Sequence, residues 1–312
     1  MTDCVVVQPI AGVGLDLLRA AGLSLHVASD RSLGALAPHL AAARAVVTRD
    51  AGFSAEAIGL SPRLKVIGVH GTGTNAVAKD VARDRGIAVV NTPGANAQSV
   101  AELTLALMLA CTKRLVEADA AVRAGDFAFR YRQRSHELQG RTLGLVGFGH
   151  VSRRVARLAL AFDMTVLGWS RSAAPGDMAE HGMRHVADLD ALCAASDVVS
   201  LHGIPGPTPL FDEARLARLK PGAIVVNTGR GGLLDEAALI EGLAAGRIGA
   251  AGLDVFQHEP LPADSPLVGA PNLVLTPHLG GATQEALERT ALEVARKVIA
   301  ALGLPVPAGG AV

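Results

Sequence analysis

Three polar side chains in the last third of the sequence stand just after apolar runs, where a strand would end. They are Arg230, Glu259 and His278. The carboxyl ends of parallel strands face the ligand crevice of an open α/β sheet, so residues far apart in sequence can converge there. A guanidinium binds a carboxylate through two parallel hydrogen bonds, and an imidazole exchanges a proton near neutral pH. These residue types could therefore bind a small acid and transfer a proton to it.

A glycine turn earlier in the chain indicates a dinucleotide site. The segment 143–152 (LGLVGFGHVS) is typical of a strand, a tight turn and the start of a helix. Gly147 permits the turn, and Gly149 lets the backbone approach a pyrophosphate at the helix N-terminus. The pattern is G-x-G-x-x-G with Ser152 in the third position. The candidate cofactor contacts at this turn are Gly147, Phe148, Gly149, His150 and Val151.

The end of the next apolar run bears on the choice of cofactor. An NAD site would place Asp or Glu about 20 residues beyond the glycines, to hold the ribose 2′-hydroxyl. This chain has Ser170, Arg171 and Ser172 there instead. An arginine and two hydroxyls suit a 2′-phosphate through charge-assisted hydrogen bonds. We therefore expect the protein to prefer NADP(H), with NAD(H) as the alternative. If these three residues have no role in cofactor binding, the segment is a solvated turn.

The elements that would position these residues are buried parallel strands. Continuous apolar runs flanked by glycine alternate with helical periodicity, which is typical of βαβ units. In the first third the runs are Cys4–Ile10, Leu23–Ala28, Ala45–Thr48, Lys65–His70 and Ile87–Asn91. The second series is Leu143–Gly147, Thr165–Trp169, Asp197–His202, Ala223–Asn227, Gly249–Val255 and Leu273–Pro277.

Two such series predict an α/β protein with two doubly wound, Rossmann-like parallel sheets. Long helical stretches at Ala97–Val122 and Gly281–Leu302 stand at the joints. We expect the last helix to return to the first domain. The predicted substrate domain, flavodoxin-like, comprises residues 1–98 and 286–312, and the dinucleotide-binding domain, residues 99–285, is inserted into it.

Composition limits the classes of function. Of 312 residues, 50% are hydrophobic and 19% charged, and 29 basic residues balance 29 acidic ones, as in a globular protein without an electrostatic footprint for nucleic acid or an anionic membrane. The cysteines Cys4, Cys111 and Cys193 form no CxxC pair, so we expect neither a disulfide framework nor a metal site. No signal peptide and no membrane-spanning stretch is evident, which favours a cytoplasmic protein.

Several motifs in order resemble the D-isomer-specific 2-hydroxyacid dehydrogenases over nearly the whole chain. The resemblance implies that His278 is the acid/base, that Glu259 pairs with its imidazole and that Arg230 binds the carboxylate and carbonyl of the substrate. It also implies cofactor contacts at Thr228, Gly229, Asp254 and Gly280, and a homodimer. The motifs are Asn91-Thr92-Pro93-Gly94, Val100-Ala101-Glu102, the glycine turn, Asn227-Thr228-Gly229-Arg230-Gly231, Asp254-Val255-Phe256, Glu259-Pro260 and Pro277-His278.

The substrate side is expected in the first domain, in a glycine loop that follows an apolar run. Such a loop exposes successive N–H groups that can bind a carboxylate. The resemblance implies substrate contacts here and at Arg49, which matches a family position near the substrate. The loop candidates are Gly71, Thr72, Gly73 and Thr74. A basic run at Arg130, Arg132 and Arg134 is interpreted as a solvated connection or a subunit contact rather than a phosphate site.

The motifs together predict an oxidoreductase that transfers a hydride between NADP(H) and a small 2-keto or D-2-hydroxy acid. The string Trp169-Ser170-Arg171-Ser172 resembles that of the NADPH-using glyoxylate/hydroxypyruvate reductases of this family. One alternative is an NAD-dependent D-3-phosphoglycerate or other D-2-hydroxyacid dehydrogenase. Another is a non-catalytic, nicotinamide-sensing corepressor on the same fold, because a fold does not fix a function.

Overall fold

Two parallel β-sheets organise the chain in the computed structural model, which describes residues 2–307. One unit contains the residues up to Asn96 and those from Gly281 onwards, and the other is Ala97–Gly280. The sheets have five and seven strands, and every pair of neighbouring strands is parallel. The predicted α/β fold class is confirmed.

The first unit has the strand order β2-β1-β3-β4-β5. The central strands are rich in valine and buried on both faces, as expected of a parallel sheet between helices. Ser32 and Ser54 cap the second and third helices by accepting backbone N–H groups. The elements are β1 (Cys4–Val6), α1 (Gly12–Ala20), β2 (Leu25–Val27), α2 (Leu33–Leu40), β3 (Ala45–Thr48), α3 (Ala55–Gly59), β4 (Val66–Val69), α4 (Lys79–Asp84) and β5 (Ala88–Asn91).

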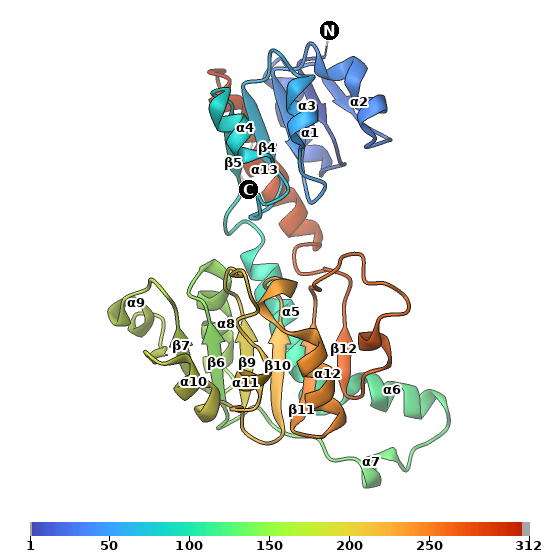
Figure 1. Ribbon diagram of the computed structural model, residues 1–312, viewed down its shortest axis with the longest axis vertical. Helices are drawn as coiled ribbons and strands as arrows, with labels where there is room; N and C mark the ends of the chain where they lie inside the picture. The colour runs from blue at the N-terminus through green and yellow to red at the C-terminus, as the bar shows by residue number, and fades with distance from the viewer. Residues whose placement is uncertain (1, 308–312) are drawn as a thin grey trace. The chain divides into compact units, whose positions relative to one another are not determined.

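The C-terminal helix α13 (Gln284–Ala301) completes this unit (Figure 1). Its buried face includes Val294 and Val298, which pack on β4. A Cβ at Gly68 would lie 2.6 Å from the Val298 side chain and 2.8 Å from that of Val294, so this strand position needs glycine. The expectation that the last helix returns to the first part of the chain is confirmed.

The second unit has the strand order β12-β11-β10-β9-β6-β7-β8. The chain runs from β6 outward to β8 and then continues at β9 on the other side of β6. The topological switch point, where open α/β sheets bind ligands, therefore lies between β6 and β9. The strands are β6 (Thr142–Val146), β7 (Thr165–Trp169), β8 (Arg184–His185), β9 (Val198–Leu201), β10 (Ala223–Asn227), β11 (Ile248–Leu253) and β12 (Leu273–Leu275).

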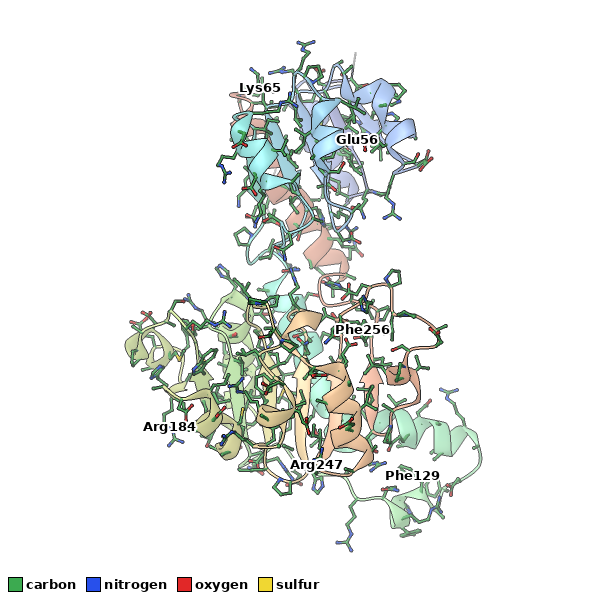
Figure 2. All side chains as sticks on the ribbon, viewed as in Figure 1. Glu56, Lys65, Phe129, Arg184, Arg247 and Phe256 are labelled. Carbon is green, nitrogen blue, oxygen red and sulfur yellow. The ribbon has the colours of Figure 1, made fainter. Side chains whose placement is uncertain are left out.

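Helices cover both faces of this sheet and enclose two hydrophobic cores (Figures 1 and 2). Residues of α5 and α8 line one core, and residues of α10, α11 and α12 line the other. The helices and 3-10 turns are α5 (Ala97–Lys113), α6 (Leu115–Arg123), α7 (Phe129–Arg132), α8 (His150–Leu160), α9 (Pro175–Ala179), α10 (Leu189–Ala195), α11 (Glu213–Leu216), η1 (Gly231–Leu233), α12 (Glu236–Ala244) and η2 (Pro266–Gly269).

The expected single helix over Ala97–Val122 is wrong, because the structure breaks it at Arg114. This residue has a left-handed backbone conformation with φ of 53°. Its guanidinium pairs with Glu117 and donates to Asn272 Oδ1 at 2.9 Å, which holds the break in place. Two separate helices, α5 and α6, result.

The remaining expectations from composition concern cysteines and membranes. Cys4, Cys111 and Cys193 are free and buried, and burial raises the pKa of each thiol to about 12, so the thiols stay protonated and unreactive near neutral pH. Over residues 2–307, none of the helices is both long and apolar enough to span a bilayer.

Candidate active site

An imidazole–carboxylate pair lies at the ends of β11 and β12. His278 Nδ1 is 2.7 Å from Glu259 Oε2, and the other oxygen of Glu259 accepts the backbone N–H of Phe256 at 3.0 Å. An ionised carboxylate can only accept, so Nδ1 must carry the proton. The His278 side chain keeps 49% of its surface exposed. Its Nε2 is therefore the nitrogen left to exchange a proton with a ligand.

The loop of His278 is fixed by the buried carboxylate of Asp254, which is 1% exposed. His278 has φ of 54°, and its N–H donates to the Asp254 carbonyl at 3.0 Å. The N–H groups of Leu279 and Gly280 donate to the two carboxylate oxygens at 2.7 and 2.9 Å, and Thr276 donates at 2.6 Å. The predicted cofactor candidates Asp254 and Gly280 thus lie together, and their polar groups bond to each other.

Arg230 follows the neighbouring strand β10, on a loop whose backbone is bonded by the Asn227 side chain. The Asn227 side chain is fully buried; it donates to the Arg230 carbonyl at 2.9 Å and accepts the N–H of Gly229 at 3.1 Å. A Cβ at Gly231 would lie 1.9 Å from the carbonyl carbon of Phe256, so only glycine lets this loop pack against the loop that bears Glu259. The loops after three adjacent strands, β10, β11 and β12, therefore carry the three candidate residues at one edge of the sheet.

The glycine turn fits a dinucleotide. Gly147 has φ of 99°, and a Cβ there would lie 2.9 Å from the backbone N of Gly203. Gly149 caps α8 with an ordinary φ of −129°, and a Cβ there would meet nothing within 4 Å. The chain itself does not require glycine at 149, so the open space before the helix N-terminus suits a ligand that approaches the backbone. Ser152 Oγ is buried and has no hydrogen-bond partner within residues 2–307.

The Phe148 side chain in this turn contacts two other side chains. The Arg153 guanidinium lies 4.5 Å from the centre of its ring, and the His181 ring packs against it at 5.8 Å. His150 is exposed at the first helical position, and Val151 is partly buried beside it. The five candidates at the turn therefore lie in one short stretch around the start of α8.

The candidate 2′-phosphate residues follow β7 in an exposed turn. Ser170 Oγ accepts the N–H groups of Ser172 and Ala173, each at 3.3 Å. Arg171 is exposed and, in the part of the chain that the structure describes, forms none of the ion pairs. Its guanidinium is 3.9 Å from the position of a Cβ on Gly206. The positive charge is thus unneutralised and available to an anion.

The glycine loop of the first unit offers free backbone donors after β4. Gly71 has φ of 141°, and its N–H donates to Thr92 Oγ1 at 3.0 Å, so this donor is used inside the protein. The Thr72 carbonyl accepts from Asn91 at 2.7 Å. Among the described residues, no bond engages the N–H groups of Thr72, Gly73 and Thr74. Three successive N–H groups are thus left to donate to a ligand such as a carboxylate.

Arg49 follows β3, next to the strand that leads into this loop. The side chain of Gln8, which is 8% exposed, accepts the N–H groups of Arg49 and Ala51 at 3.1 and 2.9 Å and donates to Asp50 at 2.8 Å. Burial lowers the pKa of His70, and the positive charge of Arg49 lowers it further. Gln8, which the sequence did not single out, therefore shapes the Arg49 turn.

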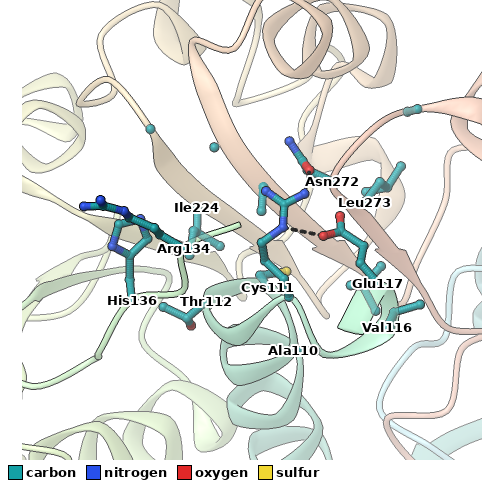
Figure 3. A pocket seen from close by; sticks show the side chains of 16 residues that line it. Ala110, Cys111, Thr112, Val116, Glu117, Arg134, His136, Ile224, Asn272 and Leu273 are labelled. Atoms are coloured by element: carbon teal, nitrogen blue, oxygen red, sulfur yellow. Dashed lines mark hydrogen bonds and ion pairs between the residues drawn. The ribbon is translucent and has the colours of Figure 1, made fainter. Parts of the chain in front are cut away.

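A pocket of about 350 Å³ lies elsewhere in the second unit (Figure 3). Its lining includes Gly222 and Asn272, which precede β10 and β12, so it opens at the amino ends of these strands. Glu117, which forms an ion pair with Arg114, borders one side, and His136 stands across from Glu117 (Figure 3). The pocket is at the sheet edge opposite to His278 and Arg230 and is not part of the candidate site.

His202, at the end of β9, is a site residue that sequence analysis did not select. Its Nε2 lies 2.9 Å from Ser200 Oγ and its Nδ1 3.5 Å from Thr228 Oγ1. Thr228 Oγ1 in turn lies 2.9 Å from Thr104 Oγ1 on α5. Burial lowers the pKa of His202 to about 4, so the ring is neutral at physiological pH. The sequence signal for this residue is that Ser200 and His202 are polar residues in the otherwise apolar run Val198–His202.

We expect His202 to make the protein less stable in acid. Its folded pKa of about 4 lies below the ordinary 6.5, so the unfolded chain takes up the proton first as the pH falls. The stability is present above about pH 6.5 and declines toward pH 4; between about pH 7.5 and 4.5 the loss from this group is about 2 to 3 kcal/mol. Urea unfolding at both pH values should show a smaller loss in His202→Asn, and His136→Asn, at an exposed site, should behave like wild type.

Comparison with known proteins places this arrangement in context. A family model described as "D-isomer specific 2-hydroxyacid dehydrogenase, NAD binding domain" matches residues 105–280. D-3-phosphoglycerate dehydrogenase of Archaeoglobus fulgidus is 37% identical over 96% of this chain and 58% of its own length. Hydroxypyruvate reductase of Thermotoga maritima is 38% identical over 83% of this chain and 84% of its own length. The chain thus spans little more than half of the first of these relatives.

The solved structures agree in fold. A crystal structure of a Thermus thermophilus protein superposes with a TM-score of 0.87 at 36% identity, covering 98% of this chain and 99% of that one. The similarity therefore extends over both units of the chain and over the loops that follow β10, β11 and β12.

Proposed function

Because the chain belongs to the D-isomer-specific 2-hydroxyacid dehydrogenase family, we propose that it transfers a hydride between NADP(H) and a small 2-keto or D-2-hydroxy acid, with glyoxylate or hydroxypyruvate as the first choice of substrate. The observation that carries the proposal is the His278–Glu259 pair, 2.7 Å apart, on loops adjacent to that of Arg230. This arrangement combines a proton donor with a group that binds the acid.

Each candidate residue has a separate role in the proposed reaction. The reduced nicotinamide, when bound, supplies the hydride that reaches C2 of the keto acid. His278 Nε2 gives its proton to the carbonyl oxygen, which becomes the hydroxyl, and Glu259 holds the ring in place through Nδ1. Arg230 binds the substrate carboxylate. The N–H groups of the 72–74 loop and Arg49 offer further carboxylate donors in the first unit.

The experiment that tests this function follows the oxidation of NADPH and NADH at 340 nm. The acids to compare are glyoxylate, hydroxypyruvate, pyruvate, oxaloacetate and phosphohydroxypyruvate. We expect turnover with NADPH and glyoxylate or hydroxypyruvate. Turnover with NADH and phosphohydroxypyruvate instead would favour the second candidate, D-3-phosphoglycerate dehydrogenase, which the 37% identity to the Archaeoglobus enzyme supports. Coenzyme binding without turnover on any acid would favour a corepressor-like module.

Preference for NADP(H) is proposed from the free charge of Arg171. Removing a charge-assisted contact to the 2′-phosphate costs about 1.5–3 kcal/mol. Arg171→Ala should therefore raise the KM for NADPH about ten- to hundredfold and leave the KM for NADH within about twofold. The matched control is Arg247→Ala, which removes an exposed arginine just before β11, at the opposite edge of the sheet. A wild-type enzyme that uses NADH more efficiently than NADPH would contradict the preference.

We propose that two copies of the chain form a homodimer through helices α6 and α7, because apolar side chains in this region are exposed in the single chain. Neither helix has a buried residue in the single chain, and Figure 2 shows Phe129 on α7 away from the sheet. Exposed apolar side chains on two neighbouring helices are typical of a protein interface. The exposed residues are Leu115, Val116, Val122, Phe127 and Tyr131, each 52–76% exposed.

We expect light scattering after gel filtration to give twice the chain mass of 31.9 kDa for the wild type. The double variant Val122→Asp/Phe127→Asp should give the mass of one chain, because two charges would be buried at the interface. Val13→Asp, at an exposed valine of α1, should leave the mass unchanged. A monomeric wild type would contradict the proposed dimer.

A further inference from the structure

Glu236, the first residue of α12, is a partly buried carboxylate next to the loop that bears Glu259. Its Oε1 accepts the backbone N–H of Gln257 at 2.7 Å. Within residues 2–307, none of the ion pairs includes Glu236. A carboxylate that is withdrawn from water is usually paired with a cation. This one is held instead by a backbone donor of the neighbouring loop.

Burial sets the electrostatics of this side chain. It raises the pKa of Glu236 above its ordinary value, against the opposing effect of the hydrogen bond from Gln257. The bond therefore offsets part of what the charge loses when water is withdrawn. A perturbed carboxylate beside other candidate residues is typical of a functional site. These observations favour a role in the site over a solvated position at the helix end.

Gln257 is bonded twice to the connection between β10 and α12. Besides its N–H bond to Glu236, its side-chain Nε2 donates to the Leu234 carbonyl at 2.8 Å. The preceding residue, Phe256, is 8% exposed and packs in a hydrophobic core of this unit. A Cβ at Gly231 would lie 2.4 Å from the Gln257 nitrogen, so the two segments are in close contact. We call the pair of bonds from Gln257 to Glu236 and Leu234 the loop clip.

Both segments that the loop clip joins carry candidate residues of the site. Arg230 precedes Glu236 on the connection after β10, and Glu259 follows Gln257 in the loop after β11. One oxygen of Glu259 accepts a backbone N–H of its own loop at 3.0 Å, and the other is 2.7 Å from His278 Nδ1. The loop clip therefore fixes the carboxylate that orients the imidazole relative to the loop of the arginine.

We propose that Glu236 is a positioning residue: through Gln257 it holds the loop of Glu259, and so keeps the candidate imidazole oriented for proton transfer. Glu236 itself takes no proton in the reaction. A misplacement of about 1 Å caused away from the reacting atoms can lower a rate about a hundredfold. Loss of the loop clip should therefore lower kcat without changing coenzyme binding. This kinetic consequence rests on the proposed function, whereas the loop clip itself needs no ligand.

Two substitutions of Glu236 separate the hydrogen bond from the charge. Glu236→Ala removes the acceptor of the Gln257 N–H, so kcat for the 2-keto acid should fall about ten- to hundredfold, with the dissociation constant of the coenzyme within about twofold of wild type. Glu236→Gln keeps an oxygen acceptor, and its kcat should stay within about threefold of wild type. The matched control is Glu241→Ala, at an exposed glutamate of the same helix, which should leave kcat unchanged.

The kinetic result decides between positioning and packing. A kcat of Glu236→Ala within about threefold of wild type would overturn the proposal. A Glu236→Gln variant that loses as much as Glu236→Ala would overturn it too, because the charge and not the acceptor would then matter. A purely structural role predicts that kcat and coenzyme binding weaken together in both variants, and that result would assign Glu236 to folding alone.

Amide hydrogen exchange followed by NMR tests the loop clip without any ligand. The N–H of Gln257 should be protected in the wild type and in Glu236→Gln. In Glu236→Ala it should exchange at least about tenfold faster, which is the weight of one charge-assisted hydrogen bond. Amides of the buried strand β10 should keep their protection in all three proteins, which shows that the fold is intact. An unprotected Gln257 N–H in the wild type would overturn the proposal.

The His278 Nδ1 proton gives a second readout that is independent of turnover. Its NMR signal, assigned by its absence in His278→Asn, should be visible in the wild type and in Glu236→Gln. In Glu236→Ala it should be lost to exchange with water, because Glu259 no longer holds it. Retention of the signal in Glu236→Ala would overturn the inference. A wild type that turns over none of the five acids would instead contradict the proposed function, which is a distinct outcome.

Discussion

Replacement of His278 by Asn is expected to lower kcat for reduction of the 2-keto acid by about 10²- to 10⁴-fold, the usual contribution of a positioned general acid. Asn retains a group that can donate to Glu259 but has no second nitrogen in the place of Nε2. The proton for the carbonyl oxygen must then come from water. Since the hydride is supplied by the coenzyme and not by this side chain, the dissociation constant of the coenzyme should change little.

The neighbouring residue provides the matched control. His258 is exposed and adjacent to Glu259, so His258→Asn should keep near-wild-type turnover. Glu259→Gln leaves His278 without the carboxylate that orients Nδ1, and we expect a smaller loss of kcat than in His278→Asn, because the imidazole remains but is oriented less well. A kcat for His278→Asn within about tenfold of wild type would remove His278 from the proposed mechanism.

The two sheets were predictable because most parallel strands in this chain are continuous runs of Val, Ile, Leu and Ala between glycines. All five strands of the first sheet fall within the predicted runs. In the second sheet the edge strand β8 was missed, since Arg184–His185 is only two residues long and polar. Its pairing with β7 depends on tertiary contacts that no local pattern contains.

The break between α5 and α6 was not predicted for a similar reason. The segment through Arg114 has good helical composition, and nothing local to it requires a left-handed residue. The partners that hold the break are Glu117, three residues on, and Asn272, which lies 158 positions away. A helix boundary fixed by such a distant side chain cannot be seen from propensity alone.

The residues expected to react directly with the substrate could be predicted from the sequence. The residues that support them could not. Strand-end logic and the family motifs selected Arg230, Glu259 and His278, and the structure brings Glu259 and His278 into contact. The supporting network of Thr104 and His202 was missed because its bonds join α5, β9 and β10, which come together only in the fold. A threonine inside an apolar helix has no ligand-binding signature in sequence.

Arg230 should be the second position at which a single change nearly abolishes activity. Arg230→Gln removes the charge and the planar fork that binds a carboxylate, and two charge-assisted hydrogen bonds together account for about a 10²- to 10⁴-fold loss in kcat/KM for the 2-keto acid. Arg230→Lys keeps the charge but offers a single ammonium, so its loss should fall between that of Arg230→Gln and wild type.

The loop geometry makes this test specific to the guanidinium. Asn227 holds the Arg230 loop through two side-chain bonds to the backbone, in addition to the bond that the Arg230 guanidinium donates to the Gly229 carbonyl at 2.7 Å. Free guanidinium ion added to an Arg230→Gly variant should therefore restore part of the lost turnover with glyoxylate, while leaving His278→Asn unrescued. If activity depended only on net positive charge at the sheet edge, Arg230→Lys would equal wild type, and the carboxylate-binding role of Arg230 would have to be abandoned.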